Sequence, residues 1–430
     1  MSAKIKRIVP ALLDWYAANA RDLPWRREPD CSDPYCVYVS EIMLQQTQVK
    51  TVIPYWERWM RALPDIQSLA DADTATIHKL WEGLGYYTRV RNMQQAAREI
   101  LARHHGEFPR THAEILALPG IGPYTAGAIA SIAFGQPAPI LDGNVIRVLT
   151  RVFAIAENPR EKSTNQKLWH LAQQLVTAAA VSEHATRNTQ HAPPNFKPKT
   201  LNLKPSAVSR LNQSLMELGA LICTPKQPKC PECPVRQNCR AHRLGNVEQF
   251  PNLAKRAAAT QRRFLAFVIK NRGRYLVRQR PAGQVNAHLW EFPNVEIPAN
   301  PLIPSFSPNG GEGARRADEG VAPKRSLRER TSVRSPLGEV RVSSPRLLPI
   351  QQASDLANAH LGLRLTHVQK LCTLKHTITR YRITLDVVIA DCGLRIADSP
   401  EENGRWLKPA ELHLLPFTSA HGKILQRILA

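Results

Sequence analysis

Four cysteines crowded into one short segment are the residues best placed to do chemistry. Their spacing is Cys223-x6-Cys230-x2-Cys233-x5-Cys239, whereas the other four cysteines are scattered along the chain. Four close thiolates can hold a zinc ion or an iron–sulfur cluster, and the spacing alone leaves both open. One tight cluster in a long chain differs from the dense disulfide framework of small secreted proteins. We therefore predict a metal centre in a reducing compartment.

Two carboxylates are candidates for acid and electrostatic catalysis. Glu41 lies in SEIMLQQTQV and Asp142 lies in ILDGNVIRV. Cleavage of a glycosidic bond through a cationic sugar needs a proton donor and a nearby negative charge, so the two pKa values must be pushed apart. Each residue also has an ordinary interpretation. A Glu near a helix start commonly pairs with the helix dipole, and an Asp before Gly commonly forms a turn.

A glycine hairpin between two helices is predicted over residues 111–134. Residues 111–114 (THAE) fit a capping box that begins the first helix, and Pro123 suits the first position of the second. Between them, Gly120 and Gly122 allow the backbone to approach a ligand closely. Exposed N–H groups at a helix N-terminus bind anions, so this hairpin is a candidate phosphate site. An ordinary helical turn is the alternative.

The charge balance predicts a polyanionic partner. The 430 residues include 58 Lys and Arg against 35 Asp and Glu, a net charge of +23. Neutralised phosphates release counterions, which favours nucleic acid, with an anionic membrane surface as the alternative. No run of about 18 apolar residues predicts a membrane span, so no membrane is expected. The first residues lack the features of an export signal, and we expect a bacterial cytoplasmic, nucleoid-associated protein.

The hydropathy pattern divides the chain into a mainly α region and a mixed α/β region. Apolar residues recur at helical spacing through residues 1–245, and no convincing strand is found there. Residues 246–261 are predicted to be a basic linker, and residues 262–430 to form a second domain. Two polar, proline-containing stretches, 183–207 and 298–348, lack periodic apolar positions and are predicted to be mobile insertions.

Two strand signals support the second domain. FLAFVIKNRGRYLVRQRP is typical of two strands around an Asn271-Arg272-Gly273 turn. YRITLDVVIA alternates at first, with Tyr381, Ile383 and Leu385 on one face and the polar residues Arg382, Thr384 and Asp386 on the other.

Together these motifs resemble the MutY-type adenine DNA glycosylases of the endonuclease III-like helix-hairpin-helix superfamily. The segments that carry the resemblance occur in the family's order: SEIMLQQTQV, WEGLGYYTRVRNM, LPGIGPYTAGAIAS, PILDGNVIRV and the cysteine cluster. The resemblance covers nearly the whole chain. It implies a helical glycosylase domain with an iron–sulfur cluster loop, followed by a C-terminal α/β MutT-like (Nudix-like) domain. It also implies a monomer that removes adenine mispaired with 8-oxoguanine or guanine from double-stranded DNA.

The resemblance assigns roles to the candidate catalytic residues. It implies that Glu41 protonates adenine, that Asp142 stabilises the cationic sugar and that Asn144 supports this chemistry. Tyr124 stands where bifunctional relatives carry a lysine that forms a Schiff base with the sugar. Tyrosine cannot form a Schiff base, so we predict a monofunctional glycosylase that leaves an abasic site. Tyr124 is expected to line the sugar, with a packing aromatic as the alternative.

The same resemblance implies how the base is reached and read. A base buried in a duplex must be extruded before its glycosidic bond can be cut. The positions implied to enter the duplex or to neighbour that wedge are Leu44, Gln46, Leu84 and Tyr86. The positions implied to contact adenine are Arg26 and Gln213, and the amide of Gln213 can pair with adenine bidentately. Surface hydrogen bonding is the alternative for these two.

The implied cofactor is a [4Fe–4S] cluster on Cys223, Cys230, Cys233 and Cys239, because this spacing is the family's signature. In the second domain, HLWEFPN resembles the MutT scaffold. The run of carboxylates that would hold magnesium is not found, so recognition of 8-oxoguanine is implied instead of nucleotide hydrolysis.

The lesion-sensing loop departs from the family pattern. Many members carry His-Thr-Phe-Ser-His there, whereas this chain has His376-Thr377-Ile378-Thr379-Arg380. We predict that the hydroxyl of Thr379 keeps lesion recognition and that Arg380 adds a phosphate contact, with weaker discrimination than is typical as the alternative.

Two other functions remain as alternatives. An endonuclease III-like glycosylase with lyase activity is disfavoured by Tyr124 and by the second domain. A non-enzymatic DNA-binding repair protein is disfavoured because both Glu41 and Asp142 are present.

Overall fold

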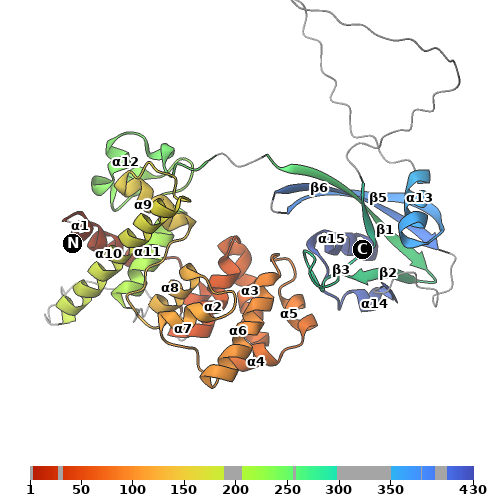
Figure 1. Cartoon of the computed structure of the whole chain (residues 1–430), viewed down its shortest axis with the longest axis horizontal. Helices are drawn as coiled ribbons and strands as arrows, with labels where there is room; N and C mark the ends of the chain where they lie inside the picture. The colour runs from red at the N-terminus through yellow and green to blue at the C-terminus, as the bar shows by residue number, and fades with distance from the viewer. Residues whose placement is uncertain are drawn as a thin grey trace, which may run out of the picture. The chain divides into compact units, whose positions relative to one another are not determined.

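The computed structural model describes residues 3–27, 32–187, 206–254, 258–297, 350–378, 380–392 and 404–430, with the backbone alone at 183–187. The chain folds into two units (Figure 1). The first comprises Met1–Ala258, Gln279–Glu291 and Ala410–Ala430. The second comprises Ala259–Arg278 and Phe292–Pro409. None of the described helices is long and apolar enough to cross a membrane.

The first unit is mainly helical, as predicted. Several helices begin at an Asp, Ser or Thr whose side chain accepts a hydrogen bond from the first turn, which satisfies backbone donors that a helix leaves unpaired. Its N-terminal part contains α1 (Ala3–Asn19), α2 (Pro34–Leu44), α3 (Val49–Ala62), α4 (Ile66–Asp71), α5 (Thr74–Leu80), α6 (Thr88–His104), α7 (His112–Ala117) and α8 (Pro123–Ile132). There follow α9 (Gly143–Phe153), α10 (Lys162–Arg187), α11 (Ala207–Leu221) and α12 (Arg240–Arg243).

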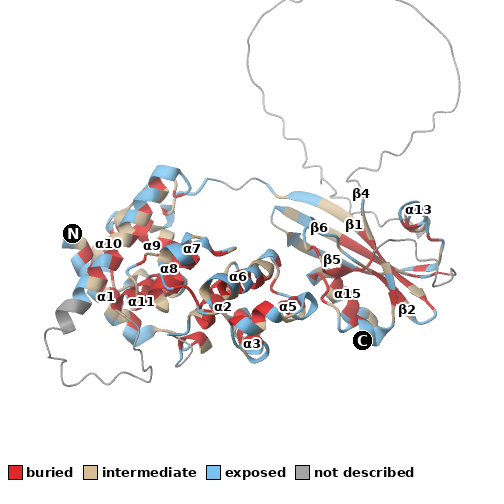
Figure 2. Ribbon diagram, turned by 60° about the horizontal axis from the view of Figure 1, so that its bottom comes forward, coloured by how far each residue is buried: buried red, intermediate tan, exposed pale blue. Residues whose placement is uncertain are grey.

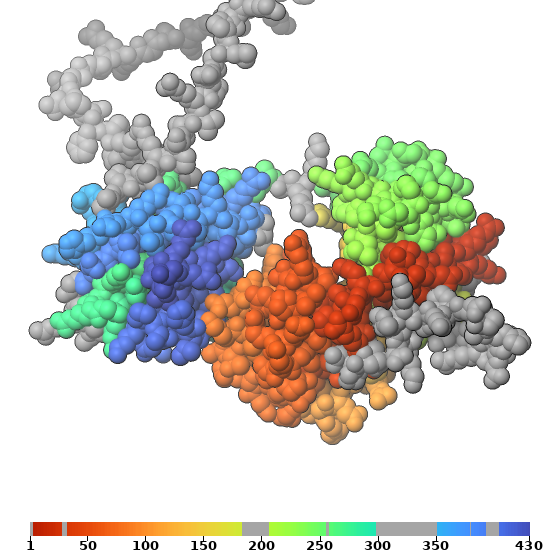
Figure 3. Space-filling model, turned by 180° about the vertical axis from the view of Figure 1, so that it is seen from behind, coloured from red at the N-terminus to blue at the C-terminus, as the bar shows by residue number. Residues whose placement is uncertain are grey.

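Two hydrophobic clusters form the core of these helices. The first collects apolar side chains from α2 to α8, including Trp59 and Trp81, whose rings meet edge to face at 5.7 Å. The second collects side chains of α1, α9, α10 and α11. Although α1 is distant in sequence from α11, the two pack together, and Figure 3 shows the red N-terminal segment beside the light-green one. Helices α2 and α8 are buried along most of their length (Figure 2).

The predicted glycine hairpin is present between α7 and α8. The Thr111 hydroxyl accepts from the backbone N–H of Glu114, and the Glu114 carboxylate accepts from the backbone N–H of Thr111, which completes the predicted capping box. Gly120 has a φ of +73°, and a Cβ there would come within 2.5 Å of the Asn92 side chain. Only glycine fits this position without strain. Pro123 occupies the first turn of α8, as predicted.

The second unit is built on a mixed sheet, which confirms the predicted α/β class. Strand β1 (Thr260–Asn271) runs parallel to β6 (Tyr381–Cys392), and β5 (Leu365–Ile378) lies antiparallel on the other side of β6. The strand β2 (Arg274–Gln279) pairs antiparallel with β1 and with β7 (Gly404–Leu407), and β4 (Asn294–Ile297) also pairs with β1. Helix α13 (Ile350–Leu361) packs its apolar face against this sheet.

The turn between β1 and β2 lies where the sequence indicated. Arg272 and Gly273 have φ values of +46° and +74°, the left-handed conformation that a tight hairpin requires. The structure also contains β3 (Trp290–Glu291), α14 (Pro409–Leu412) and α15 (Ser419–Leu429).

The predicted insertions are only partly described. Helix α10 continues to Arg187, into the stretch 183–207 that the sequence indicated to be irregular. No glycine or proline interrupts residues 183–187, so the helix meets no breaker there. The rest of that stretch up to residue 205 and the predicted insertion 298–348 lie outside the described residues. The predicted domain limits and the linker at 246–261 stay predictions.

Candidate active site

The candidate site is a cavity of about 620 Å³ in the helical unit. Its walls come from both hydrophobic clusters: α2 belongs to the first, whereas α9 and α11 belong to the second. The hairpin before α8 contributes Gly122 but not Gly120. The predicted residues that line this cavity are Arg26, Glu41, Leu44, Gln46, Gly122, Tyr124, Asp142, Asn144 and Gln213. Residues that are far apart in the sequence therefore line the same cavity.

Glu41 is a buried carboxylate in the last turn of α2, with only 6% of its surface exposed. This position excludes the ordinary interpretation of a dipole partner at a helix start. The Tyr124 hydroxyl donates to Glu41 Oε2 at 2.6 Å. Burial, together with the nearby Asp142 charge, raises the pKa of Glu41 to about 7 against the opposing effects of this hydrogen bond and of the Arg26 charge. A substantial fraction of Glu41 is therefore protonated at neutral pH.

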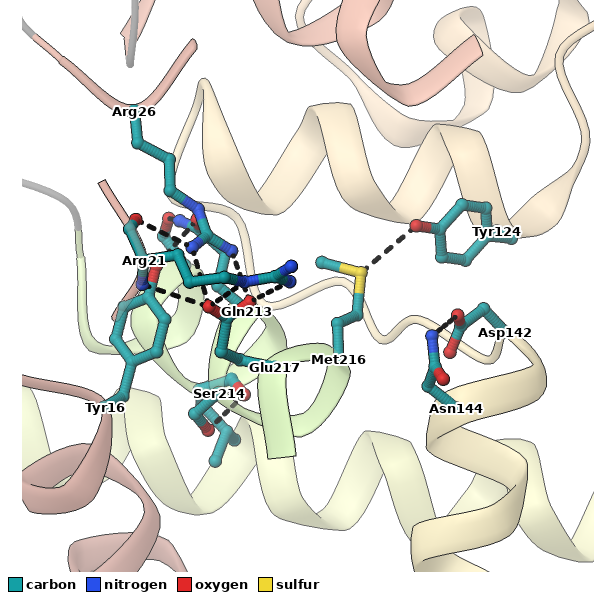
Figure 4. A network of polar contacts seen from close by, with 12 residues as sticks. Tyr16, Arg21, Arg26, Tyr124, Asp142, Asn144, Gln213, Ser214, Met216 and Glu217 are labelled. Carbon is teal, nitrogen blue, oxygen red and sulfur yellow. Dashed lines mark hydrogen bonds and ion pairs between the residues drawn. The ribbon is translucent and has the colours of Figure 1, made fainter. Parts of the chain in front are cut away.

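Asp142 is the N-cap of α9. Its Oδ1 accepts from the backbone N–H of Val145 at 2.7 Å. Its Oδ2 accepts from Asn144 Nδ2 at 2.9 Å (Figure 4). Burial raises the pKa of Asp142, but hydrogen bonds from the first turn of α9 oppose this increase. Asp142 therefore has the local structural role that a turn residue before glycine commonly has, because it caps a helix. It also lines the cavity.

Tyr124 connects the two sides of the cavity. Besides Glu41, its hydroxyl contacts the Met216 sulfur at 3.1 Å, and Figure 4 shows the two side chains facing each other. Burial and the two nearby carboxylates raise the pKa of Tyr124 well above its usual value. The hydroxyl therefore keeps its proton and acts as a hydrogen-bond donor.

The two predicted adenine contacts line the cavity but are already bonded to other groups. Arg26 forms an ion pair with Glu217 at 3.2 Å. Gln213 Oε1 accepts from the Tyr16 hydroxyl at 2.8 Å; both side chains are labelled in Figure 4. Gln213 Nε2 donates to Ser209 Oγ at 3.2 Å. A base that entered the cavity would have to share or replace these bonds.

Glu217 is a cavity residue that the sequence analysis missed. It also binds Arg21, with Nε to Oε1 at 2.7 Å. Burial would raise the pKa of Glu217, but the bonds to Arg21 and Arg26 outweigh it and lower the pKa to about 2. Glu217 lies one helical turn after Gln213 on α11, so the (i, i+4) spacing was a signal that could have identified it.

Two of the predicted wedge residues line the cavity, and the other two lie in the loop between α5 and α6. Leu44 and Gln46 line the cavity, whereas Leu84 and Tyr86 do not. Leu84 is buried in the first cluster, and Tyr86 is 48% exposed. Gln46 and Tyr86 share a left-handed backbone, with φ values of +58° and +51°. The predicted lesion-sensing residue Thr379 lies outside the described residues.

The four clustered cysteines line a second, smaller cavity beside α9 and α11. Burial raises the pKa of Cys233 to about 12, and it also raises the pKa values of Cys230 and Cys239. Thiols in this state become thiolates together only when bound positive charge compensates them. One such charge comes from the protein, because Nη1 of the buried Arg151 lies 3.3 Å from Cys223 Sγ.

Four cysteine thiols that line one cavity are a donor set that fits an iron–sulfur cluster. Among the described residues no three His, Cys, Asp or Glu side chains converge closely enough to hold one metal ion. A [4Fe–4S] cube is a larger body with one thiolate at each iron, and the four thiols surround one space.

The chain is similar in sequence to known proteins. Residues 39–174 match the HhH-GPD superfamily of base excision DNA repair proteins. The adenine DNA glycosylase of Rattus norvegicus is 40% identical over 336 residues, which are 66% of this chain, and the match spans only 60% of the rat protein's length. The adenine DNA glycosylase of Buchnera aphidicola subsp. Schizaphis graminum is 36% identical over 286 residues, 66% of this chain and 74% of that protein.

A solved structure is similar to part of the chain. The MutT Nudix hydrolase from Burkholderia pseudomallei matches with a TM-score of 0.25 and 16% identity, over 39% of this chain and 98% of that one. The sequence relatives decide the assignment, because one of them is matched over about three quarters of its length. The chain therefore belongs to the adenine DNA glycosylase family.

Proposed function

We propose that this protein hydrolyses the N-glycosidic bond of adenine mispaired with 8-oxoguanine or guanine in double-stranded DNA, and leaves an abasic site. One observation carries the proposal. A carboxyl group with a pKa of about 7, held by a tyrosine hydroxyl, and a second carboxyl group with its own hydrogen bonds line the same cavity. This is the arrangement that an acid and a charge-stabilising group need for glycosidic cleavage.

In the proposed mechanism Glu41 donates a proton to adenine, which makes the base a better leaving group. Tyr124 orients the Glu41 carboxyl group through its hydrogen bond to Oε2. As the glycosidic bond breaks, positive charge develops on the sugar, and the Asp142 carboxylate stabilises it. Asn144 fixes the orientation of that carboxylate by donating to Oδ2. Water then bonds to the sugar carbon that adenine has left and releases a proton, and Glu41 regains a proton before the next cycle.

The absence of an amine nucleophile supports a monofunctional reaction. Among the described residues no lysine lines the cavity, and the hairpin position carries Tyr124. Without a Schiff base the enzyme has no route to strand cleavage by β-elimination.

We propose that Cys223, Cys230, Cys233 and Cys239 hold a [4Fe–4S] cluster. When bound, the cluster supplies a structural cross-link that folds the loop after α11. Arg147 connects this loop to the active site. Its Nε donates to the Cys223 carbonyl at 2.7 Å, and its Nη2 donates to Asn144 Oδ1 at 2.8 Å.

Lesion recognition is proposed for the loop between β5 and β6. Thr379 would contact 8-oxoguanine, and Arg380 is the candidate phosphate contact. The Arg380 guanidinium lies over the Tyr381 ring at 5.1 Å and donates to the Tyr381 hydroxyl at 2.9 Å. The monomeric state and the bacterial cytoplasm also stay predictions.

The test is a duplex with one adenine opposite 8-oxoguanine, incubated with the protein and then divided into samples with and without hot alkali. Cleavage only after alkali is expected, and Glu41→Gln should abolish it. The matched control is Glu107→Gln, an exposed carboxylate that does not line the cavity. Cleavage without alkali would contradict the monofunctional proposal. No cleavage in either sample would contradict adenine excision altogether.

A further inference from the structure

Arg89, in the first turn of α6, binds the end of α2 through one guanidinium nitrogen. Its Nη1 lies 2.7 Å from the Ile42 carbonyl, 3.3 Å from that of Met43 and 2.7 Å from that of Gln45. The last carbonyls of a helix have no partner within the helix, and a positive charge there is favourable. Arg89 therefore caps α2 from a different helix, immediately before Gln46.

The other guanidinium nitrogen binds the second loop. Arg89 Nη2 donates to the carbonyls of Leu84 at 3.2 Å and Gly85 at 3.1 Å. The guanidinium also lies over two rings, 5.2 Å from that of Trp81 and 5.6 Å from that of Tyr86. One planar group thus ties together two chain segments that are about forty residues apart in sequence.

The residue that follows each tied segment is held in an unfavourable backbone conformation. Gln46 and Tyr86 have φ values of +58° and +51°, although neither is glycine. Such residues persist only where the surrounding structure fixes them. The five carbonyl bonds of Arg89 lie directly before these two residues and supply that constraint.

The charge of Arg89 is not neutralised by an acid. Among the described residues no Asp or Glu forms an ion pair with it, and its partners are carbonyl groups and ring faces. Burial lowers the pKa of Arg89 to about 10, so the side chain remains charged at neutral pH. The two loops therefore share a fixed positive charge at their base, and a DNA backbone is the polyanion that such a charge attracts.

We propose that Arg89 is the positioning residue that holds Gln46 and Tyr86 as one rigid wedge, so that both enter the duplex together and adenine is extruded. This inference rests on the proposed adenine excision and deepens it, because it assigns the extrusion step to a residue that contacts neither the base nor the cavity. A lysine cannot replace it. An ammonium group is a single point of charge with three donors, and it lacks the planar fork that reaches both loops.

The test compares Arg89→Lys with the parent protein and with Arg98→Lys. Arg98 lies on the same helix and also donates to a backbone carbonyl, that of Ala70 at 3.0 Å, which makes it a matched control. Excision is measured in a single turnover on two substrates. In the first, adenine is paired with 8-oxoguanine in a duplex. In the second, adenine lies in an unpaired bulge and is already unstacked. Fluorescence of 2-aminopurine placed next to the paired adenine reports extrusion at saturating protein.

Arg89→Lys is expected to slow excision of the paired adenine by about tenfold to a hundredfold and to lose most of the fluorescence increase. It is expected to keep the parent's rate on the bulged adenine, and Arg98→Lys is expected to match the parent on both. Equal losses on both substrates, or no loss on either, would overturn the positioning role. A parent protein that cuts neither substrate would instead overturn the proposed function. Arg89→Gln, with the same readouts, replaces Arg89→Lys if the lysine variant does not fold.

Discussion

The protonation of Glu41 gives the sharpest prediction. Because Glu41 must carry a proton to donate it, the excision rate should fall as the pH rises through about 7, the pKa that burial gives this carboxyl group. Tyr124→Phe removes the hydroxyl that donates to Glu41 Oε2 at 2.6 Å. That hydrogen bond stabilises the ionised form and lowers the pKa. The variant should therefore move the fall in rate to higher pH.

The size of the shift follows from the strength of the lost bond. A hydrogen bond to a charged group contributes about 1.5–3 kcal/mol, and about 1.4 kcal/mol corresponds to one pH unit. The alkaline limb of the profile should thus move up by about one to two pH units. The acidic limb should stay in place, because its position depends on ionisation of Asp142, whose pKa is set by burial and by the first turn of α9.

The assay is single-turnover excision on the adenine:8-oxoguanine duplex, from about pH 5 to about pH 10, with alkali used to reveal the abasic site. Tyr87→Phe is the control. Tyr87 is buried and does not line the cavity, so removal of its hydroxyl should shift neither limb. If Tyr124→Phe left the alkaline limb unchanged or moved it to lower pH, Glu41 would not be the proton donor.

Three further predictions concern the neighbouring residues. Asp142→Asn should keep the cap on α9, because Asn and Asp cap equally well, while it abolishes excision by removing the charge; retention of the parent's rate would refute this role. Glu217→Gln should lower the free energy of unfolding by about 3 kcal/mol in urea titrations, because it leaves the Arg26 charge buried without its partner; an unchanged midpoint would show that the pair contributes little. Cys233→Ser should lose the visible absorbance of an iron–sulfur cluster and most bound iron, with Cys372→Ser as the control, and full iron content would exclude Cys233 as a ligand.

Features fixed by neighbouring residues were predictable from the sequence. The capping box at Thr111 and Glu114 and the glycine turn after it depend on local hydrogen bonds and local backbone preferences. The turn at Arg272 and Gly273 between β1 and β2 follows the same logic. The fold class and the family were also predicted correctly, because several motifs in a fixed order identify a family far better than any one of them.

Features fixed by distant residues were less predictable. Asp386 was placed on the polar face of its strand, yet it is buried, because it pairs with Arg263 at 2.7 Å and accepts from Thr373. Arg263, whose charge compensates the buried Asp386 carboxylate, lies on another strand. A local sequence pattern does not reveal such a partner. Glu217 was missed for a related reason. Its carboxylate binds two arginines, Arg21 and Arg26, which lie nearly two hundred residues earlier in the chain.

The two candidate catalytic carboxyl groups show how local structure can separate two groups in one environment. Burial raises the pKa of both Glu41 and Asp142. Asp142 receives hydrogen bonds from the first turn of the helix that it caps, whereas Glu41 receives one from Tyr124. Because hydrogen bonds to the ionised form oppose the effect of burial, the capping residue is better stabilised as a carboxylate. The hydrogen bonds of the helix cap therefore favour the negative charge on Asp142, while Glu41 keeps its proton more readily.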